Sequence, residues 1–351
     1  MHAPAGGTLS HCAALLHRFF LPLLLATYAA SGVFPGPGVT IREYAVALPG
    51  GHQERVSMLL LAVLLFCAAA VIEWSQVREL VDHPSILLAG LLTRWFGPPL
   101  LVVACGALLA QALGDPATEG LLVGLALVAA MPVANSAAGW TQNARGNVTL
   151  SLGLIVLSIL LSPLATPNLL KLMGLVLSAE DTDRIEQVVE QFSGWRFILW
   201  VILPSLAGAA AAWRAGPQRI ARAKPAFRII TMAAILTLNY ANASLAIERL
   251  WASEPLSVIA LAATLAVAVS SIGWGLALLQ ARAMNLSPST MTGLGFSLSM
   301  KHTGLALVLA GEVLHDQPRV ILVILLSTLA QHLVAAAADR RLTRSWRLAV
   351  R

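Results

Sequence analysis

Residues 286–312 read LSPSTMTGLGFSLSMKHTGLALVLAGE, an apolar stretch long enough to cross a bilayer, with Lys301 and His302 near its middle. A charged side chain at the centre of a membrane helix costs about 2.5–3.5 kcal/mol on insertion scales, so such residues usually face a cavity or a partner. Serine, threonine and glycine surround Lys301 and interrupt the apolar pattern. The stretch therefore predicts a broken membrane helix with a functional site at the break.

Similar apolar segments recur along the whole chain. Hydrophobic residues make up 58% of the sequence and charged residues only 11%. Long runs with so few charges are typical of membrane-spanning helices, so the predicted fold class is all-α, a polytopic membrane protein with about ten transmembrane helices. The expected spans are residues 14–34, 56–74, 85–113, 118–141, 148–175, 194–213, 226–247, 256–280, 286–312 and 317–338.

The basic residues follow the expected topology. Lys and Arg gather in residues 214–228, between the sixth and seventh spans, and in the basic tail 339–351. Because these residues concentrate on the cytoplasmic side of membrane proteins, both termini are expected in the cytoplasm and the protein in a cell membrane, the bacterial inner membrane. The lipid bilayer is an expected partner and nucleic acid is not. The acidic stretch 180–191 is expected to form a surface helix on the outer face. The oligomeric state is left open.

The two halves of the sequence resemble each other weakly. A shift of 169 residues places Gly124 and Met131 on Gly293 and Met300. With five spans in each half the copies would have opposite orientations, and inverted repeats of this kind are common among secondary transporters. Chance similarity between Leu-rich helices is the competing explanation. The predicted transporter domain covers residues 14–338. Its first repeat covers about residues 14–175 and its second repeat about residues 194–338.

The fourth span contains a break that matches the one in the ninth. It reads Met131-Pro132-Val133-Ala134-Asn135-Ser136, and proline removes a backbone donor and clashes with the preceding turn. Broken helices place half-helix ends near the membrane midplane, where ions and substrates bind. A simple proline kink is the alternative for this span alone. Matching breaks in both halves favour a binding site.

Several motifs occur in an order that is typical of one transporter family. They are residues 131–140, the block ARGNVTLS at 144–151, LSPLATP at 161–167, NYAN at 239–242, residues 300–304 and Gln331-His332. On these motifs the chain resembles the bile acid:sodium symporter family from about residue 14 to residue 338. The resemblance implies a ten-helix fold with a panel and a core domain, in which the fourth and ninth spans cross. It also implies transport of organic anions coupled to two sodium ions.

The chain departs from the family pattern at the sodium ligands. The positions that carry ligand oxygens in the family fall on Ala137, Ala138, Ser151, Ile155, Ser297, Lys301 and, with a less certain alignment, Arg94. Of these only Ser151 keeps the hydroxyl, Ser297 stands in place of a glutamate, and two positions carry cations. We therefore predict that the second sodium site cannot hold sodium and that the first has lost most of its ligands. No metal and no cofactor are expected.

The function predicted on this basis is secondary transport of an organic anion, bile-acid-like or a small carboxylate, by alternating access. Lys301, with Arg94, would replace the sodium ions permanently and favour an anionic substrate. In one variant Lys301 or His302 carries a proton, because histidine titrates near neutral pH. In another, the two cations only cap the carbonyls at half-helix ends, where the helix dipole is negative.

Four polar residues are candidate substrate contacts, namely Asn135, His302, Gln331 and His332. The paired amides of the NYAN motif, in contrast, are expected to hold the helices together. Export of another solute is a further alternative, and a protein that has lost transport and acts as a sensor or scaffold is a different class. An enzyme is not expected, since no carboxylate pair, nucleophile–base pair or metal-ligand cluster is visible in the sequence.

Overall fold

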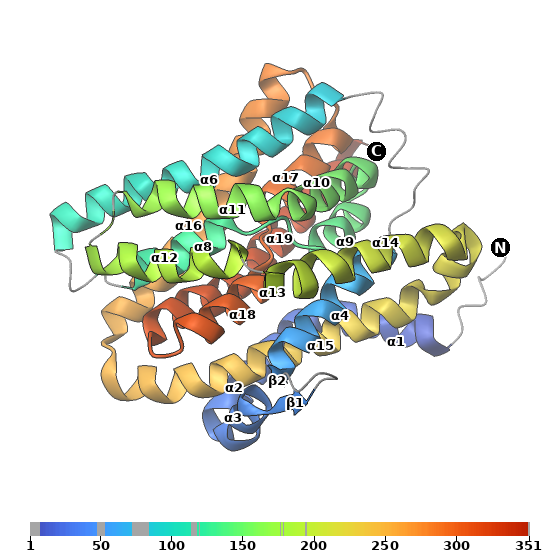
Figure 1. The fold of residues 1–351 in the computed structure, drawn as a ribbon. Coiled ribbons are helices and arrows are strands. Elements are labelled where there is room, and N and C mark those ends of the chain that lie inside the picture. The colour runs from blue at the N-terminus through green and yellow to red at the C-terminus, as the bar shows by residue number, and fades with distance from the viewer. Residues whose placement is uncertain are drawn as a thin grey trace. The chain divides into compact units, whose positions relative to one another are not determined.

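The computed structural model describes residues 8–47, 53–71, 84–113, 118, 120–175, 177, 179–193 and 195–349, and most of them are helical (Figure 1). The elements before the first long apolar helix are α1 (Thr8–Arg18), α2 (Phe20–Val33), α3 (Pro35–Glu43), β1 (Ala45–Ala47), β2 (Gln53–Arg55) and α4 (Val56–Ala70). Those of the middle of the chain are α6 (Pro84–Leu113), α8 (Leu121–Ala130), α9 (Ser136–Asn143), α10 (Val148–Leu160), α11 (Ser162–Gly174) and α12 (Ala179–Ser193). The remainder are α13 (Trp195–Phe197), the π-helix η1 (Ile198–Ile202), α14 (Leu203–Ala215), α15 (Pro217–Ser253), α16 (Leu256–Ala283), α17 (Pro288–Ser299), α18 (Thr303–Val313) and α19 (Pro318–Ala349).

Several helices are long and apolar enough to cross a membrane. Within the described residues four pass this test, namely Pro84–Leu108, Ile198–Ala215, Leu256–Ala283 and Pro318–Leu342. The number rises to 6 if each of two sharply bent helix pairs forms one span. The chain is therefore an all-α, multi-pass membrane protein, while ten spans in inverted repeats stay a prediction.

Three local features differ from the sequence-based expectations. The segment expected as one span at 148–175 is two helices, α10 and α11, that bend by 75°. Pro163 explains the bend because it has no N–H for the carbonyl of Ile159, and Ser162 Oγ donates to that carbonyl instead at 2.7 Å. The expected tail at 339–351 continues α19 as helix to Ala349. The antiparallel β1–β2 pair was not expected at all.

Contacts divide the chain into two units. The first unit contains residues 1–74 and 195–248, and the second contains residues 75–194 and 249–351. Each unit thus combines a segment from the first half of the chain with one from the second half. The two broken spans both belong to the second unit.

Buried amides of α15 join helices within the first unit. Tyr28 of α2 donates its hydroxyl hydrogen to Asn239 Oδ1 at 2.8 Å. Arg42 of α3 donates from Nη1 to Asn242 Oδ1 at 2.5 Å. Both asparagines are almost fully buried. Their role in holding the helices together, expected from the NYAN motif, is confirmed by these contacts.

Helix α8 forms the interior of the second unit. All of its ten residues are buried, as expected for a helix that is apolar on every side. It packs against α6, α11 and α19 (Figure 1). Gly124 allows the close approach to α19, because a Cβ at this position would lie only 2.8 Å from the carbonyl oxygen of Val320. The break that follows α8 is therefore held inside a tightly packed core.

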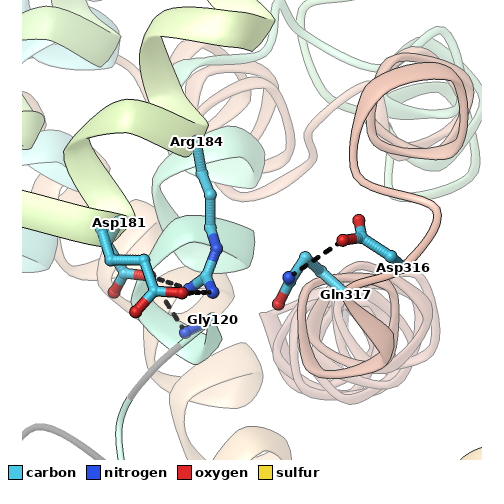
Figure 2. A network of polar contacts seen from close by, with 6 residues as sticks. Gly120, Asp181, Arg184, Asp316 and Gln317 are labelled. Carbon is cyan, nitrogen blue, oxygen red and sulfur yellow. Dashed lines mark hydrogen bonds and ion pairs between the residues drawn. The ribbon is translucent and has the colours of Figure 1, made fainter.

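The buried carboxylate of Asp181 connects the acidic helix α12 to the residue before α8. Asp181 Oδ1 accepts the backbone N–H of Gly120 at 3.3 Å and an N–H of Arg184 Nη1 at 2.8 Å (Figure 2). Gly120 has a left-handed backbone with φ of 72°, which glycine adopts without strain. The expected helix at 180–191 is therefore present, and Asp181 gives it a docking contact.

Candidate functional site

Both predicted helix breaks are present and buried. Helix α8 ends at Ala130 and α9 begins at Ser136, while α17 ends at Ser299 and α18 begins at Thr303. The helices before the two breaks, α8 and α17, end 169 residues apart. This equals the shift at which the two halves of the sequence resemble each other. The residues that follow these ends, Met131 and Met300, have extended backbones.

The two breaks meet and pair through their main chains. Val133 and Lys301 form an antiparallel bridge. Ala134 donates its backbone N–H to Met300 O at 3.1 Å, and His302 donates its backbone N–H to Pro132 O at 2.9 Å. A break in a membrane helix leaves backbone groups that must be satisfied inside the protein. Here the two breaks satisfy each other, and we call this bridge and its side-chain contacts the crossing.

Two side chains from neighbouring helices hold the remaining N–H groups of the bridge. Val133 donates its N–H to Ser158 Oγ of α10 at 3.0 Å. Lys301 donates its N–H to Gln331 Oε1 of α19 at 2.8 Å, and Gln331 Nε2 lies 3.5 Å from Thr303 Oγ1. Gln331, expected as a substrate contact, thus has both ends of its amide engaged within the crossing.

A buried cation binds a carbonyl at the end of each first half-helix. Arg94 of α6 donates from Nη1 to Ala129 O of α8 at 2.8 Å. Lys301 donates from Nζ to Leu298 O of α17. Both side chains are only 1% exposed, and within the described part of the chain neither forms an ion pair with a carboxylate. These contacts agree with a capping role, because the C-terminal end of a helix is negative.

The other positions predicted to correspond to sodium ligands of the family carry small or apolar side chains. Ser297 Oγ lies 2.9 Å from Ser151 Oγ and 2.8 Å from the carbonyl oxygen of Gly293. Ala137 and Ile155 are buried and, like the half-buried Ala138, carry no side-chain oxygen. Hard cations require several oxygen ligands. The side chains at these positions do not fit a pair of sodium ions, since they supply two hydroxyls that already bond each other.

His302 and Asn135 lie at the N-terminal ends of the second half-helices. His302 Nδ1 accepts the N–H of Leu305 at 3.1 Å and so caps α18. Asn135 precedes α9 without capping it, and its Oδ1 is buried with no hydrogen-bond partner among the described residues. His302 therefore has a structural contact on one nitrogen, and Asn135 keeps its acceptor free.

His332 belongs to an aromatic cluster beside the crossing. Trp140 of α9 donates its indole N–H to His332 Nδ1 at 3.3 Å. The Trp140 ring stacks on Phe296, with centroids 6.2 Å apart, and Phe296 meets Trp274 edge-on at 4.9 Å. Gly295 leaves room for the Trp274 ring, since a Cβ there would lie 2.4 Å from it. The cluster joins α9, α16, α17 and α19 around the second break.

The structure thus brings several of the predicted site residues together and adds two. Lys301, His302 and Gln331 meet at the bridge, and Arg94 lies at the end of α8. Sequence reasoning missed Ser158, and it also missed Thr166, whose hydroxyl donates to Ala130 O at 3.2 Å. The signal for these two residues was weak, because each is a single hydroxyl side chain in an apolar segment after the break at Pro132.

Comparisons with known proteins agree with this geometry. The family model described as the sodium bile acid symporter family matches residues 58–253, which include the first break. An uncharacterized protein of Bacillus subtilis (strain 168), YbaS, is 25% identical over 327 residues, which cover 92% of this chain and 97% of that protein. Members of the matched family are transporters and not enzymes. The chain therefore belongs to the sodium bile acid symporter family.

Proposed function

We propose that this protein is a secondary carrier of an organic anion that works by alternating access without a bound sodium pair. The observation that carries the proposal is the pair of buried cations, Lys301 and Arg94, at the ends of the two first half-helices. In this proposal they take the place of the metal ions that couple transport elsewhere in the family. The substrate is a bile-acid-like molecule or a small carboxylate.

The charge of the crossing supports an anionic substrate. At an effective dielectric constant near 20, two unit charges about 4 Å apart interact by about 4 kcal/mol. An anion near Lys301 gains this energy, whereas a sodium ion at the same distance loses it. No described carboxylate offsets the difference, because neither Lys301 nor Arg94 forms an ion pair. The same charges therefore attract the substrate and repel the coupling ion.

Three polar side chains are the proposed substrate contacts. His302 Nδ1 accepts a backbone hydrogen, so the neutral ring carries its own hydrogen on Nε2, where it is a donor for a carboxylate. Asn135 offers an amide oxygen with no partner among the described groups, which can accept from a hydroxyl of the substrate but not from its carboxylate. His332 Nδ1 accepts from Trp140, so its neutral ring likewise carries the hydrogen on Nε2. Gln331 stays a proposed fourth contact, and in the free protein both ends of its amide are engaged within the crossing.

The proposed location is the cell membrane, as a bacterial inner-membrane protein with both termini in the cytoplasm. The basic residues of the α14–α15 connection support this orientation, as do Arg340 and Arg341, which are exposed near the C-terminal end of α19. The residues from 14 to 338 form one transporter domain, and the organic anion and the lipid bilayer are its partners.

The test uses the purified full-length protein. A panel of carboxylates and steroid-like anions, including taurocholate, is first screened for stabilisation against thermal unfolding, with sodium or with choline as the cation. Uptake of each stabilising anion into proteoliposomes is then measured under the same two conditions. Equal uptake with sodium and with choline supports the proposal.

Two other outcomes contradict it, and a third decides between its variants. Uptake that collapses without sodium would restore sodium coupling. Binding without uptake would identify a sensor. Uptake that follows an imposed pH gradient would identify the proton-coupled variant. Lys301→Met should abolish sodium-independent uptake, and Arg340→Met, which removes an exposed cation from α19, is its matched control.

A further inference from the structure

One donor at the crossing, the Nε–H of Arg94, has no partner in the part of the chain that the structure describes. Arg94 uses Nη1 to bind Ala129 O, but its Nε–H is buried and bonds to nothing among the described residues. A guanidinium stays protonated in proteins. The interior of the second unit therefore holds a permanent positive charge with one unsatisfied donor.

Lys301 adds a second positive charge at the same crossing. Arg94 binds the carbonyl that immediately precedes the first break, and Lys301 forms a bridge with Val133 inside that break. Two like charges at one crossing repel each other. Both side chains are 1% exposed, and no carboxylate from the described part of the chain pairs with either. Desolvation of two like charges without a counter-ion is strongly unfavourable.

A buried group that lacks a hydrogen-bond partner often marks a bound water molecule or ion. Water would accept the Nε–H of Arg94 but would leave the charge uncompensated. A small anion accepts the hydrogen bond and also neutralises the charge. A small anion can bind here through the Nε–H while Nη1 stays committed to Ala129 O.

We propose that Arg94 Nε and the ammonium of Lys301 hold a small monovalent anion, chloride in the cell, as a resident counter-ion of the crossing. The site lies at the same crossing as the proposed transport but does not require that the protein transports anything. The anion would offset the repulsion between the two cations and so stabilise the bridge between Val133 and Lys301.

The experiment is thermal unfolding of the full-length protein in detergent, in sodium gluconate and in sodium chloride at equal ionic strength. We expect a saturable rise of about 2–4 °C as chloride increases to about 100 mM. Arg94→Met should lose this rise, and Arg340→Met should keep it, because Arg340 is exposed on α19. An unchanged unfolding temperature in wild-type protein overturns the proposal, as does an equal rise in Arg94→Met.

Two further measurements test the proposal if the Arg94 variant fails to fold or if a carboxylate is the bound anion. If Arg94→Met does not fold, wild-type crystals soaked in bromide should show an anomalous peak in contact with Arg94 Nε, and a peak only elsewhere overturns the proposal. Unfolding in sodium formate tests whether the bound anion is a carboxylate. If formate stabilises the protein and chloride does not, the assignment of chloride is overturned. All these measurements are made without organic substrate, so a failure of transport leaves them unaffected and can be recognised separately.

Discussion

Gln331 is the residue for which the structure and the sequence assign different roles, and one substitution separates them. Gln331→Met keeps the length of the side chain but removes the acceptor for the Lys301 N–H and the donor near Thr303. If Gln331 mainly supports the crossing, the substitution destabilises the protein whether or not substrate is present. If it mainly binds substrate, the free protein keeps its stability and only ligand affinity falls.

The expected loss of stability follows from the backbone N–H of Lys301, which the substitution leaves buried without an acceptor. A buried donor without a partner costs about 1–3 kcal/mol. For a chain of 351 residues that corresponds to a fall in unfolding temperature of about 1–4 °C. Ser158→Ala removes the equivalent acceptor from Val133 and should cost about the same. Because the two N–H groups belong to one bridge, the double variant should show a coupling energy of about 0.5–3 kcal/mol.

Thermal and chemical unfolding of the purified variants in detergent measure these differences. Gln331→Glu retains an acceptor oxygen beside Lys301 and should lose less stability than Gln331→Met. Gln317→Leu is the matched control, since its amide contacts only the exposed Asp316 at 3.4 Å. The reasoning is refuted if Gln331→Met unfolds at the same temperature as Gln317→Leu while weakening the binding of an organic anion.

Three further predictions concern other contacts of the second unit. Gly273→Ala should destabilise by about 1–3 kcal/mol, because the added Cβ would lie 2.5 Å from a carbonyl of α17. Gly275→Ala, whose Cβ would have nothing within 4 Å, should keep or slightly raise the unfolding temperature, because alanine is the better helix former. His302→Ala should cost about 0.5–2 kcal/mol of unfolding free energy through loss of the α18 cap, and equal losses for His302→Ala and His302→Asn would contradict the cap. Asp181→Ala should speed hydrogen exchange at the start of α8 while the exposed Asp183→Ala does not, and unchanged exchange in both variants would disprove the docking contact.

The sequence predicted the two breaks because their residues depart from the usual composition of a membrane helix, and the family resemblance implied that the two broken spans cross. Pro132 cannot continue a helix, and Lys301 cannot lie in lipid, so both breaks were visible without a structure. The helix ends at Ala130 and Ser299 confirm those positions. The family resemblance also indicated which residues face the breaks, and Lys301, His302 and Gln331 do meet there.

What could not be predicted depends on contacts between distant segments. Ser158 is one hydroxyl in an apolar helix, and only the fold brings it to the N–H of Val133. Gln331 has a polar side chain that suits a ligand as well as a backbone group, so its type does not reveal its partner. The bend at Ser162-Pro163 was missed because the apolar residues on either side read as one continuous span.

The central claim is that cationic side chains occupy the crossing in place of sodium, and sodium binding tests it most directly. Equilibrium binding of radioactive sodium to the purified wild-type protein should show no saturable component. The same measurement on Lys301→Gln and on Arg340→Met shows whether any binding depends on the buried charge. Saturable sodium binding to the wild-type protein would contradict the claim.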